Sequence, residues 1–333
     1  MRPLKLAFAL VTLLAASQTH AAGARFIGIA GGPTGPATKG AVWYPCAAPP
    51  QDINIRDTSI GDRTLIGAKD CPLIPGKLPL IVISHGRTGW FGGHHDTAAA
   101  MADAGFVVAA INHPGDNAYD TSRLDSLSVL VERPADIKRL IDFMLDAWPE
   151  ASHIDARRIG LYGFSMGGYT GLVVIGGNPD FRKGLARCQG SSFRACEQLE
   201  NHELPGEAPT HDPRVKAAVI VDPASGFLFP ADNLKAVTIP VQLWSSDPAL
   251  GADHLSGCCA VGINQRLASK PDYHLAQNAR HFSFLATCTP AETQAFPRIC
   301  TDAPGFDRFA FHQQFHGEMI AFFRKHLVDG HSQ

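Results

Sequence analysis

The sequence has little charge, and its charges are not gathered in runs. Of the 333 residues, 18% are charged, with 29 lysines and arginines against 31 aspartates and glutamates. Because no basic run stands out, we expect no nucleic-acid partner. Beyond residue 16 no apolar stretch is long enough for a transmembrane helix, and we find no internal repeat or low-complexity tract. With 45% apolar residues, the chain has the composition of one large globular domain or two smaller ones, and we expect a single domain over residues 23–333.

The first 22 residues have the pattern of a secretory signal peptide. A short basic segment at residues 1–5 precedes an apolar stretch at residues 6–16, which is too short for a stable membrane anchor. Small residues follow, and we expect cleavage after Ala21 or Ala22. An uncleaved anchor is the alternative. The pattern predicts an exported protein, periplasmic or extracellular, with no stable membrane anchor after cleavage.

Eight cysteines follow the signal segment, and none of them lies in a Cys-x-x-Cys motif. The irregular spacing disfavours a zinc site, so we expect no metal. An even cysteine count in an exported chain predicts disulfides. Proximity favours three local pairs and leaves two adjacent cysteines for each other or for crossed bonds. The three pairs are Cys46–Cys71, Cys188–Cys196 and Cys288–Cys300, and the remaining two are Cys258 and Cys259.

Alternation of apolar strand-like and helix-like segments predicts the α/β class. After short strands in residues 24–75, predicted as an antiparallel start to the sheet, come buried strands at 78–84, 105–111, 158–162, 215–221 and 237–244, and a last one at 273–275. Helices are expected at 97–104, at 133–148 with Pro134 in the first turn, after residue 165, and at 307–327. This order predicts a mostly parallel sheet with helices on both faces.

Residues 181–212 interrupt this alternation. The segment is polar, lacks a strong period and carries Cys188 and Cys196. We interpret it as an insertion, which is either a cap over the functional site or an ordinary surface loop.

The most informative motif is Gly163-Phe164-Ser165-Met166-Gly167, between a predicted strand and a predicted helix. A Gly-x-Ser-x-Gly turn in this position is a nucleophile elbow, in which a strained backbone lifts the serine hydroxyl toward the substrate. Glycines on either side let the strand and helix approach closely. Ser165 is therefore the candidate nucleophile.

A serine nucleophile needs a histidine base and a carboxylate that orients the base, in the chain order Ser, acid, His. Asp222 and Asp247 both follow predicted strands and both precede proline, and spacing does not choose between them. His281, just past the last predicted strand, is the candidate base. His274 within that strand and His316 within the last helix are the alternatives, which we expect to be structural.

The developing negative charge in acyl transfer needs two backbone N–H donors. One should be the amide of Met166, directly after the serine. The loop His85-Gly86-Arg87-Thr88-Gly89 follows a buried strand, and the Arg87 amide is the second candidate. Trp90 and Phe91 are candidate substrate-binding residues beside Met166, or else packing residues. Triad chemistry needs no cofactor, and none is expected.

With these motifs in place, the chain resembles the platelet-activating-factor acetylhydrolase and dienelactone-hydrolase-like branch of the α/β-hydrolases. The resemblance spans about residues 42–281 and includes, besides the elbow, Val42-Trp43-Tyr44-Pro45, Ile83-Ser84-His85-Gly86, residues 109–117 and Glu132-Arg133-Pro134-Ala135-Asp136-Ile137. It implies an α/β-hydrolase fold. It also implies Asp222 as the acid, because Val221-Asp222-Pro223 matches the family's acid position, and it supports His281, which precedes Phe282 and Phe284.

The chain departs from this pattern in two ways. Dienelactone hydrolases proper use a cysteine nucleophile, whereas this chain has Ser165, which favours an esterase. The segments 181–212 and 252–262 do not belong to the pattern, so substrate identity is not carried over.

These observations predict an exported serine esterase that acts on small-molecule, lipid or polymer esters. The resemblance implies short acyl groups. A peptidase or amidase with the same triad is the first alternative, and a non-catalytic binding protein on the same scaffold is the second.

Overall fold

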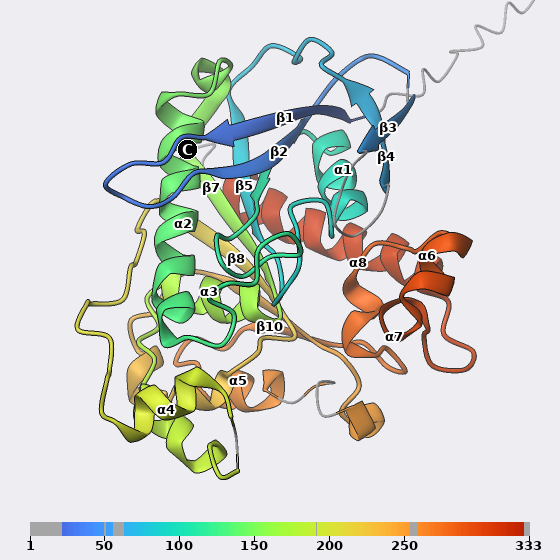
Figure 1. The fold of residues 1–333 in the computed structure, drawn as a ribbon. Coiled ribbons are helices and arrows are strands. Elements are labelled where there is room, and N and C mark those ends of the chain that lie inside the picture. The colour runs from blue at the N-terminus through green and yellow to red at the C-terminus, as the bar shows by residue number, and fades with distance from the viewer. Residues whose placement is uncertain are drawn as a thin grey trace, which may run out of the picture.

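The computed structural model describes residues 22–49, 51–55, 63–190, 192–253, 257 and 259–329. The predicted signal peptide, except Ala22, lies outside these residues, as does Cys258. Ten strands form one twisted sheet in the order β10-β9-β8-β7-β5-β6-β2-β1-β4-β3 (Figure 1). The strands are β1 (Gly23–Ile29), β2 (Thr38–Tyr44), β3 (Gln51–Ile55), β4 (Arg63–Lys69), β5 (Leu78–Ser84), β6 (Val107–Ile111), β7 (Ile154–Phe164), β8 (Val215–Val221), β9 (Val241–Ser245) and β10 (Asp272–Leu275).

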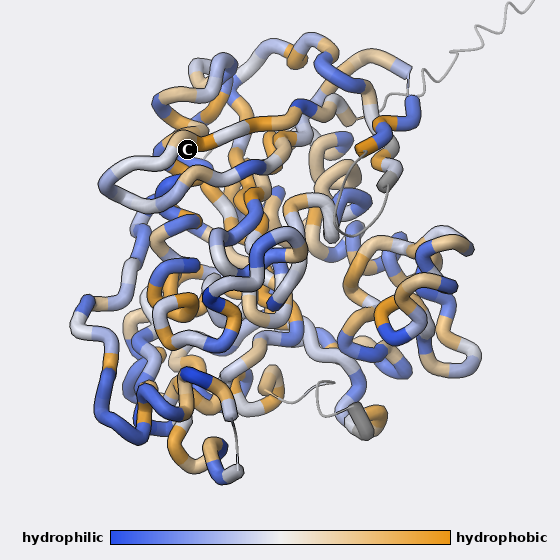
Figure 2. Tube along the Cα trace, viewed as in Figure 1, coloured by the Kyte–Doolittle hydropathy of each residue, from blue (hydrophilic) through white to orange (hydrophobic). Residues whose placement is uncertain are grey.

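The sheet is parallel in its centre and antiparallel at its start. Strands β6, β5, β7, β8, β9 and β10 pair in parallel, while β2 pairs antiparallel with β1 and β6. The predicted parallel core is therefore confirmed. The predicted antiparallel start is confirmed for β1–β2 and for β3–β4, whereas β1 and β4 pair in parallel. Central strands such as β5 and β8 are buried along most of their length because helices cover both faces. Figure 2 shows this pattern as orange along the inner strands and blue in many outer loops.

Two apolar cores lie on the two faces of the sheet. One contains residues of α2 (Leu127–Asp146), α3 (Met166–Val174) and α5 (Ala260–Arg266). The other contains residues of α1 (His95–Asp103) and α8 (Arg308–Phe323). The predicted α/β class, with helices on both faces, is confirmed. The remaining helices, α4 (Arg194–Glu200), α6 (Pro290–Ala295) and α7 (Pro297–Cys300), are short and lie in connections. Among the described residues, no helix is both long and apolar enough to cross a membrane.

Helix α2 corrects one prediction. Pro134 was expected in the first turn, but the helix begins at Leu127, with the Ser126 hydroxyl accepting from the Ser128 amide, so the proline lies inside it. A proline inside a helix leaves the carbonyl four residues earlier without its usual donor. That carbonyl belongs to Leu130, and the hydroxyl of Tyr169 donates to it over 3.3 Å. A contact from α3 therefore compensates for the proline.

Three disulfides join the local pairs that proximity predicts: Cys46–Cys71, Cys188–Cys196 and Cys288–Cys300. The second of them lies in the insertion at residues 181–212, which forms a 3-10 helix at Phe181–Arg187 followed by α4. Cys188 and Cys196 pack with Leu127 and Leu199 in a small separate apolar cluster. The insertion is thus fastened to the start of α2.

Candidate active site

Ser165 lies between the end of β7 and the start of α3, with a backbone φ of +55°. A positive φ is unfavourable for a residue with a side chain, so the turn must be held by its surroundings. The Ser165 amide donates to the Val221 carbonyl over 2.9 Å, and the Ala224 amide donates to the Ser165 carbonyl over 2.8 Å. A side chain at Gly163 would collide with the Gly167 carbonyl, and one at Gly167 with the Ser84 carbonyl. The two glycines are therefore required by close backbone approach.

The structure brings together Ser165, His281 and Asp222 from three separate loops. His281 Nε2 lies 2.9 Å from Ser165 Oγ, and His281 Nδ1 lies 2.6 Å from Asp222 Oδ2. An ionised carboxylate can only accept, so Nδ1 carries the proton and Nε2 can accept one from the serine. The exposed fractions of the three residues are 9%, 4% and 3%, so the hydrogen bonds lie in a site with little water. This is the geometry of an activated serine nucleophile.

Asp222 is held by the neighbouring strand β9. Its amide donates to the Trp244 carbonyl over 2.8 Å, and its carboxylate accepts from the Ser246 hydroxyl over 2.7 Å and from the Ser246 amide over 3.3 Å. The contribution of Ser246 was not anticipated from the sequence. Its signal is its position directly after β9, next to β8, which ends one residue before Asp222.

Asp247, the competing acid, does not contact His281 in the structure. Its two carboxylate oxygens accept from the amides of Ala249 and Asn278, each over 2.9 Å. These bonds stabilise two turns, which is a common role for aspartate. Of the alternative histidines, His274 stacks on Trp244, and His316 lies 3.0 Å from the Thr97 hydroxyl.

The loop that carries His281 is anchored from α8. The Ser283 hydroxyl donates to Asp302 over 2.6 Å, and Arg308 pairs with that carboxylate at 2.9 Å. His312 contacts the Ser283 carbonyl through Nε2 at 2.8 Å and the Asp96 carboxylate through Nδ1 at 2.6 Å. Phe164 packs on the imidazole of His281, with ring centres 4.8 Å apart. His281, the predicted base, is therefore fixed both by its ring contacts and by its loop.

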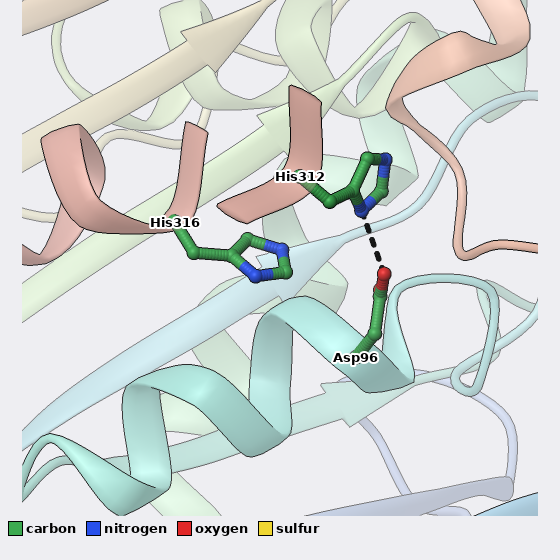
Figure 3. A group of neighbouring side chains, drawn as sticks. All are labelled: Asp96, His312 and His316. Atoms are coloured by element: carbon green, nitrogen blue, oxygen red, sulfur yellow. Dashed lines mark hydrogen bonds and ion pairs between the residues drawn. The ribbon is translucent and has the colours of Figure 1, made fainter. Parts of the chain in front are cut away.

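Asp96, His312 and His316 form the one group among the described residues whose donor atoms lie close enough to be considered for a metal ion, all within 4.8 Å (Figure 3). The carbonyl of Ser283 can only accept, so Nε2 of His312 must carry a proton, and Nδ1 faces a carboxylate. Neither nitrogen of His312 therefore has a lone pair directed at an ion. Burial raises the pKa of Asp96, but the hydrogen bond and charge of His312 outweigh burial and hold that pKa below its usual value. The group is best explained as a hydrogen-bonded anchor.

The predicted oxyanion donors lie on two segments that meet at Ser165. Met166 is the first residue of α3, where a helix leaves its amides without internal partners. A side chain on Gly86 would come within 3.2 Å of the Ser165 Cβ, so the loop after β5 passes beside the serine. Within the described part of the chain, the amides of Arg87 and Met166 have no protein acceptor. Both amides are therefore available to a substrate oxygen.

A buried ion pair, absent from the predicted site, supports this loop. Arg133 donates to the His85 carbonyl and pairs with Asp116 at 2.7 Å. The other oxygen of Asp116 accepts from the Thr88 amide over 2.9 Å. Residues 85 and 88 flank Arg87, so the pair holds the loop from both sides. Both charged residues occur in the segments that carry the family resemblance, but no local pattern relates them.

Next to this pair lies a second Ser–His–Asp set. His113 lies 2.9 Å from Ser84 Oγ and 3.1 Å from Asp136 Oδ2. Ser84 and His113 are fully buried, so a substrate cannot reach them. Burial lowers the pKa of His113 well below its usual value and raises that of Asp136 to about 7, with Arg139 and Arg133 opposing the rise. We assign the set a structural role behind residues 85–89, the predicted oxyanion loop.

Two cavities adjoin the segment after β6, which carries Asp116. One, of about 310 Å³, is lined by Arg87 and Met166 and by residues of the insertion. The other, of about 870 Å³, is lined by Phe91, by residues of the segment after β6 and by residues of β1 and β2. Phe91 is buried among core residues, and Trp90 packs on it without lining either cavity.

Comparisons with known proteins agree with this fold. A family model described as serine aminopeptidase S33 matches residues 77–225. The acylamino-acid-releasing enzyme of Rattus norvegicus is 25% identical over 138 residues, which are 40% of this chain and 18% of that protein. The structure of a ferulic acid esterase from Streptomyces cinnamoneus superposes with a TM-score of 0.63 at 16% identity, covering 94% of this chain and 91% of that one. This last likeness concerns the fold.

The sheet order, the elbow and these matches define the class of fold: the chain has an α/β-hydrolase fold. Within that class, the family match and the rat relative are of the serine-hydrolase type. The narrower branch predicted from the sequence stays a prediction, because none of these three matches is an acetylhydrolase of that kind.

Proposed function

We propose that this chain is a serine hydrolase that cleaves carboxylic esters through Ser165, His281 and Asp222. The observation that carries the proposal is the continuous chain of hydrogen bonds from Ser165 Oγ through His281 to Asp222, beside two unpaired amides. A non-catalytic binding protein would have no need for this arrangement, with its strained serine and buried carboxylate.

The geometry supports the following steps. Ser165 Oγ attacks the ester carbonyl carbon while its proton passes to His281 Nε2. The carbonyl electron pair moves onto oxygen, where the Arg87 and Met166 amides donate to it. Asp222 stabilises the imidazolium and holds the Nδ1 tautomer. Collapse of this intermediate breaks the bond to the alcohol, which leaves with the proton from Nε2. Water, activated by the same histidine, then releases the acid and restores Ser165.

A peptidase or amidase is the second candidate, favoured by the names of the matching family, serine aminopeptidase S33, and of the rat acylamino-acid-releasing enzyme. An aminopeptidase needs a free carboxylate for the substrate's ammonium group. In the cavity beside Met166, both lining carboxylates are already paired: Asp116 with Arg133 and Asp125 with Arg87. This pairing favours the esterase.

We further propose export to the periplasm or the extracellular space. The three disulfides and the signal pattern of residues 1–22 support this location. The substrates would be small-molecule, lipid or polymer esters, and the resemblance favours short acyl groups.

The test is hydrolysis of p-nitrophenyl acetate, compared with the matched p-nitroanilide. We expect turnover of the ester, little or none of the anilide, and loss of ester turnover in Ser165→Ala. Faster cleavage of the anilide would favour the peptidase, and equal ester rates in Ser165→Ala would contradict a role for this serine.

A further inference from the structure

The insertion, which the sequence predicts as either a cap or a surface loop, forms one wall of the 310 Å³ cavity. The insertion is tied to the body of the protein at several points. The Ala195 amide donates to the Asp125 carbonyl over 2.6 Å, and the Gln198 side chain accepts from the Leu127 amide over 3.0 Å. The Cys188–Cys196 disulfide closes a loop within the insertion. The far wall of the cavity is therefore held in place.

The cavity adjoins the loop of residues 85–89, which carries Arg87. Arg87 and Met166, whose amides are the proposed oxyanion donors, also line it. No residue of the His281 loop is among the lining residues. The leaving alcohol must lie near His281 Nε2, which returns the proton to it. The part of the ester that extends away from His281, into this cavity, is therefore the acyl group.

The lining is suited to an aromatic ring. Three phenylalanines, Phe181, Phe193 and Phe227, contribute to it. The guanidinium groups of Arg87 and Arg187 lie over the rings of Phe193 and Phe227, at 5.5 and 4.2 Å from their centres. Aromatic side chains favour edge and offset contacts with a further ring. A cavity of roughly 150 Å³ holds benzene, so 310 Å³ leaves room for a ring and a short linker.

We propose that this cavity is the acyl-binding site, and that it takes an acyl group bearing one aromatic ring on a short linker. The proposal rests on the esterase function above and adds a substrate class to it. It also assigns the insertion a role: residues 181–200 select the acyl group.

The experiment compares kcat/KM for the p-nitrophenyl esters of acetate, heptanoate and 3-phenylpropanoate. The wild type should favour phenylpropanoate over acetate by about tenfold or more, the size of effect that a filled apolar pocket supplies. It should also favour phenylpropanoate over heptanoate. Equal rates for these last two esters would overturn the assignment of a ring.

Ala195 is half-buried and lines the cavity, so Ala195→Trp should fill it. We expect kcat/KM for phenylpropanoate to fall about tenfold while that for acetate stays within about threefold. The matched control is Ala186→Trp, on an exposed position of the same insertion that does not line the cavity, which should change neither. If Ala195→Trp slows both esters equally, or Ala186→Trp has the same effect, the proposal is wrong.

A second variant avoids the risk that the tryptophan disturbs folding. Phe193 is 52% exposed and lines the cavity, so Phe193→Ala should fold and should reduce the preference for phenylpropanoate about threefold or more. An unchanged preference would count against the site. A wild type that fails to hydrolyse acetate refutes the esterase itself, whereas one that hydrolyses acetate without favouring phenylpropanoate refutes only the acyl site.

Discussion

Arg133 and Asp116 form an ion pair almost fully removed from solvent, with a 2.7 Å contact and side chains that are each 1% exposed. Burial lowers the pKa of the guanidinium, and the Asp116 carboxylate opposes that effect. The two residues reach the His85 carbonyl and the Thr88 amide, on either side of Arg87. This pair positions the loop that carries Arg87, the proposed second oxyanion donor.

Removal of one partner should affect both stability and rate. Asp116→Asn leaves the buried Arg133 charge uncompensated, so we expect the free energy of unfolding to fall by about 3–5 kcal/mol. Because the misplaced amide acts on the transition state, kcat should fall while KM changes little. Denaturant unfolding and steady-state kinetics measure these effects.

The control residue, Lys138, lies on helix α2, which also carries Arg133. Lys138 forms an exposed pair with Asp142, and Lys138→Met should change the unfolding free energy by less than about 1 kcal/mol. A destabilised Asp116→Asn with unchanged kcat would restrict the pair to a structural role.

The two candidate acids should behave differently when neutralised. Asp222→Asn removes the carboxylate that contacts His281 Nδ1, and the acylation rate should fall by roughly 10⁴-fold with the fold intact. Asp247→Asn affects only two turn contacts, and its acylation rate should stay within about threefold of the wild type. Pre-steady-state burst kinetics distinguish the two. The opposite ranking would assign the acid to Asp247.

Several buried histidines should make the protein sensitive to acid. Burial lowers the pKa of His85 and His113 well below the usual value, and lowers that of His94 and His316 to about 4. The unfolded chain binds protons at these groups with a pKa near 6.5, so it holds more protons than the folded chain below that pH. The stability that these neutral histidines contribute is fully present above pH 6.5 and is lost as the pH falls toward 4.

Replacement of one such histidine tests whether the buried histidines cause this loss of stability at acid pH. His94 packs between Tyr162 and Phe164, so His94→Phe should keep the aromatic packing. It also removes one group that binds a proton in the unfolded chain but not in the folded one. Between about pH 6 and 4.5, the slope of unfolding free energy against pH should decrease by about 1.4 kcal/mol per pH unit. Urea unfolding at several pH values gives the slope. An unchanged slope in a folded variant would mean that His94 is charged in the native state.

The disulfides should contribute according to the length of chain they close. Cys46 and Cys71 are separated by 25 residues, and Cys188 and Cys196 by 8. Chain entropy predicts losses of about 3.5 and about 2.5 kcal/mol when each pair is replaced by alanines. The two double variants serve as controls for each other in denaturant unfolding. A larger loss from the shorter loop would show that contacts of the insertion, rather than chain entropy, decide its stability.

Much of the fold was predictable because its strands are long apolar runs. The limits of β8 match the predicted strand, and the elbow follows β7 as the Gly-x-Ser-x-Gly pattern predicts. Ser165 and Asp222 each follow the end of a parallel strand, and such ends meet at one edge of the sheet. This topology explains why residues far apart in sequence could be predicted to form one site.

Other features depend on contacts between elements that no local pattern reveals. The periodicity identified α2, but its start was missed because the Tyr169 hydroxyl compensates for Pro134 from a different helix. Ser246 and the Arg133–Asp116 pair act across strands and loops, so their partners appear only in the folded structure. One wall of the proposed acyl cavity comes from the insertion, whose sequence lacks a period.

The central claim is that Ser165 is an activated nucleophile. Its most direct test is reaction of the folded protein with a fluorophosphonate, followed by peptide mass spectrometry. We predict one phosphonyl group on the peptide that contains Ser165, slower labelling in His281→Ala, and none in Ser165→Ala. Folded wild-type protein that remains unlabelled, or that is labelled at another residue, would contradict the account.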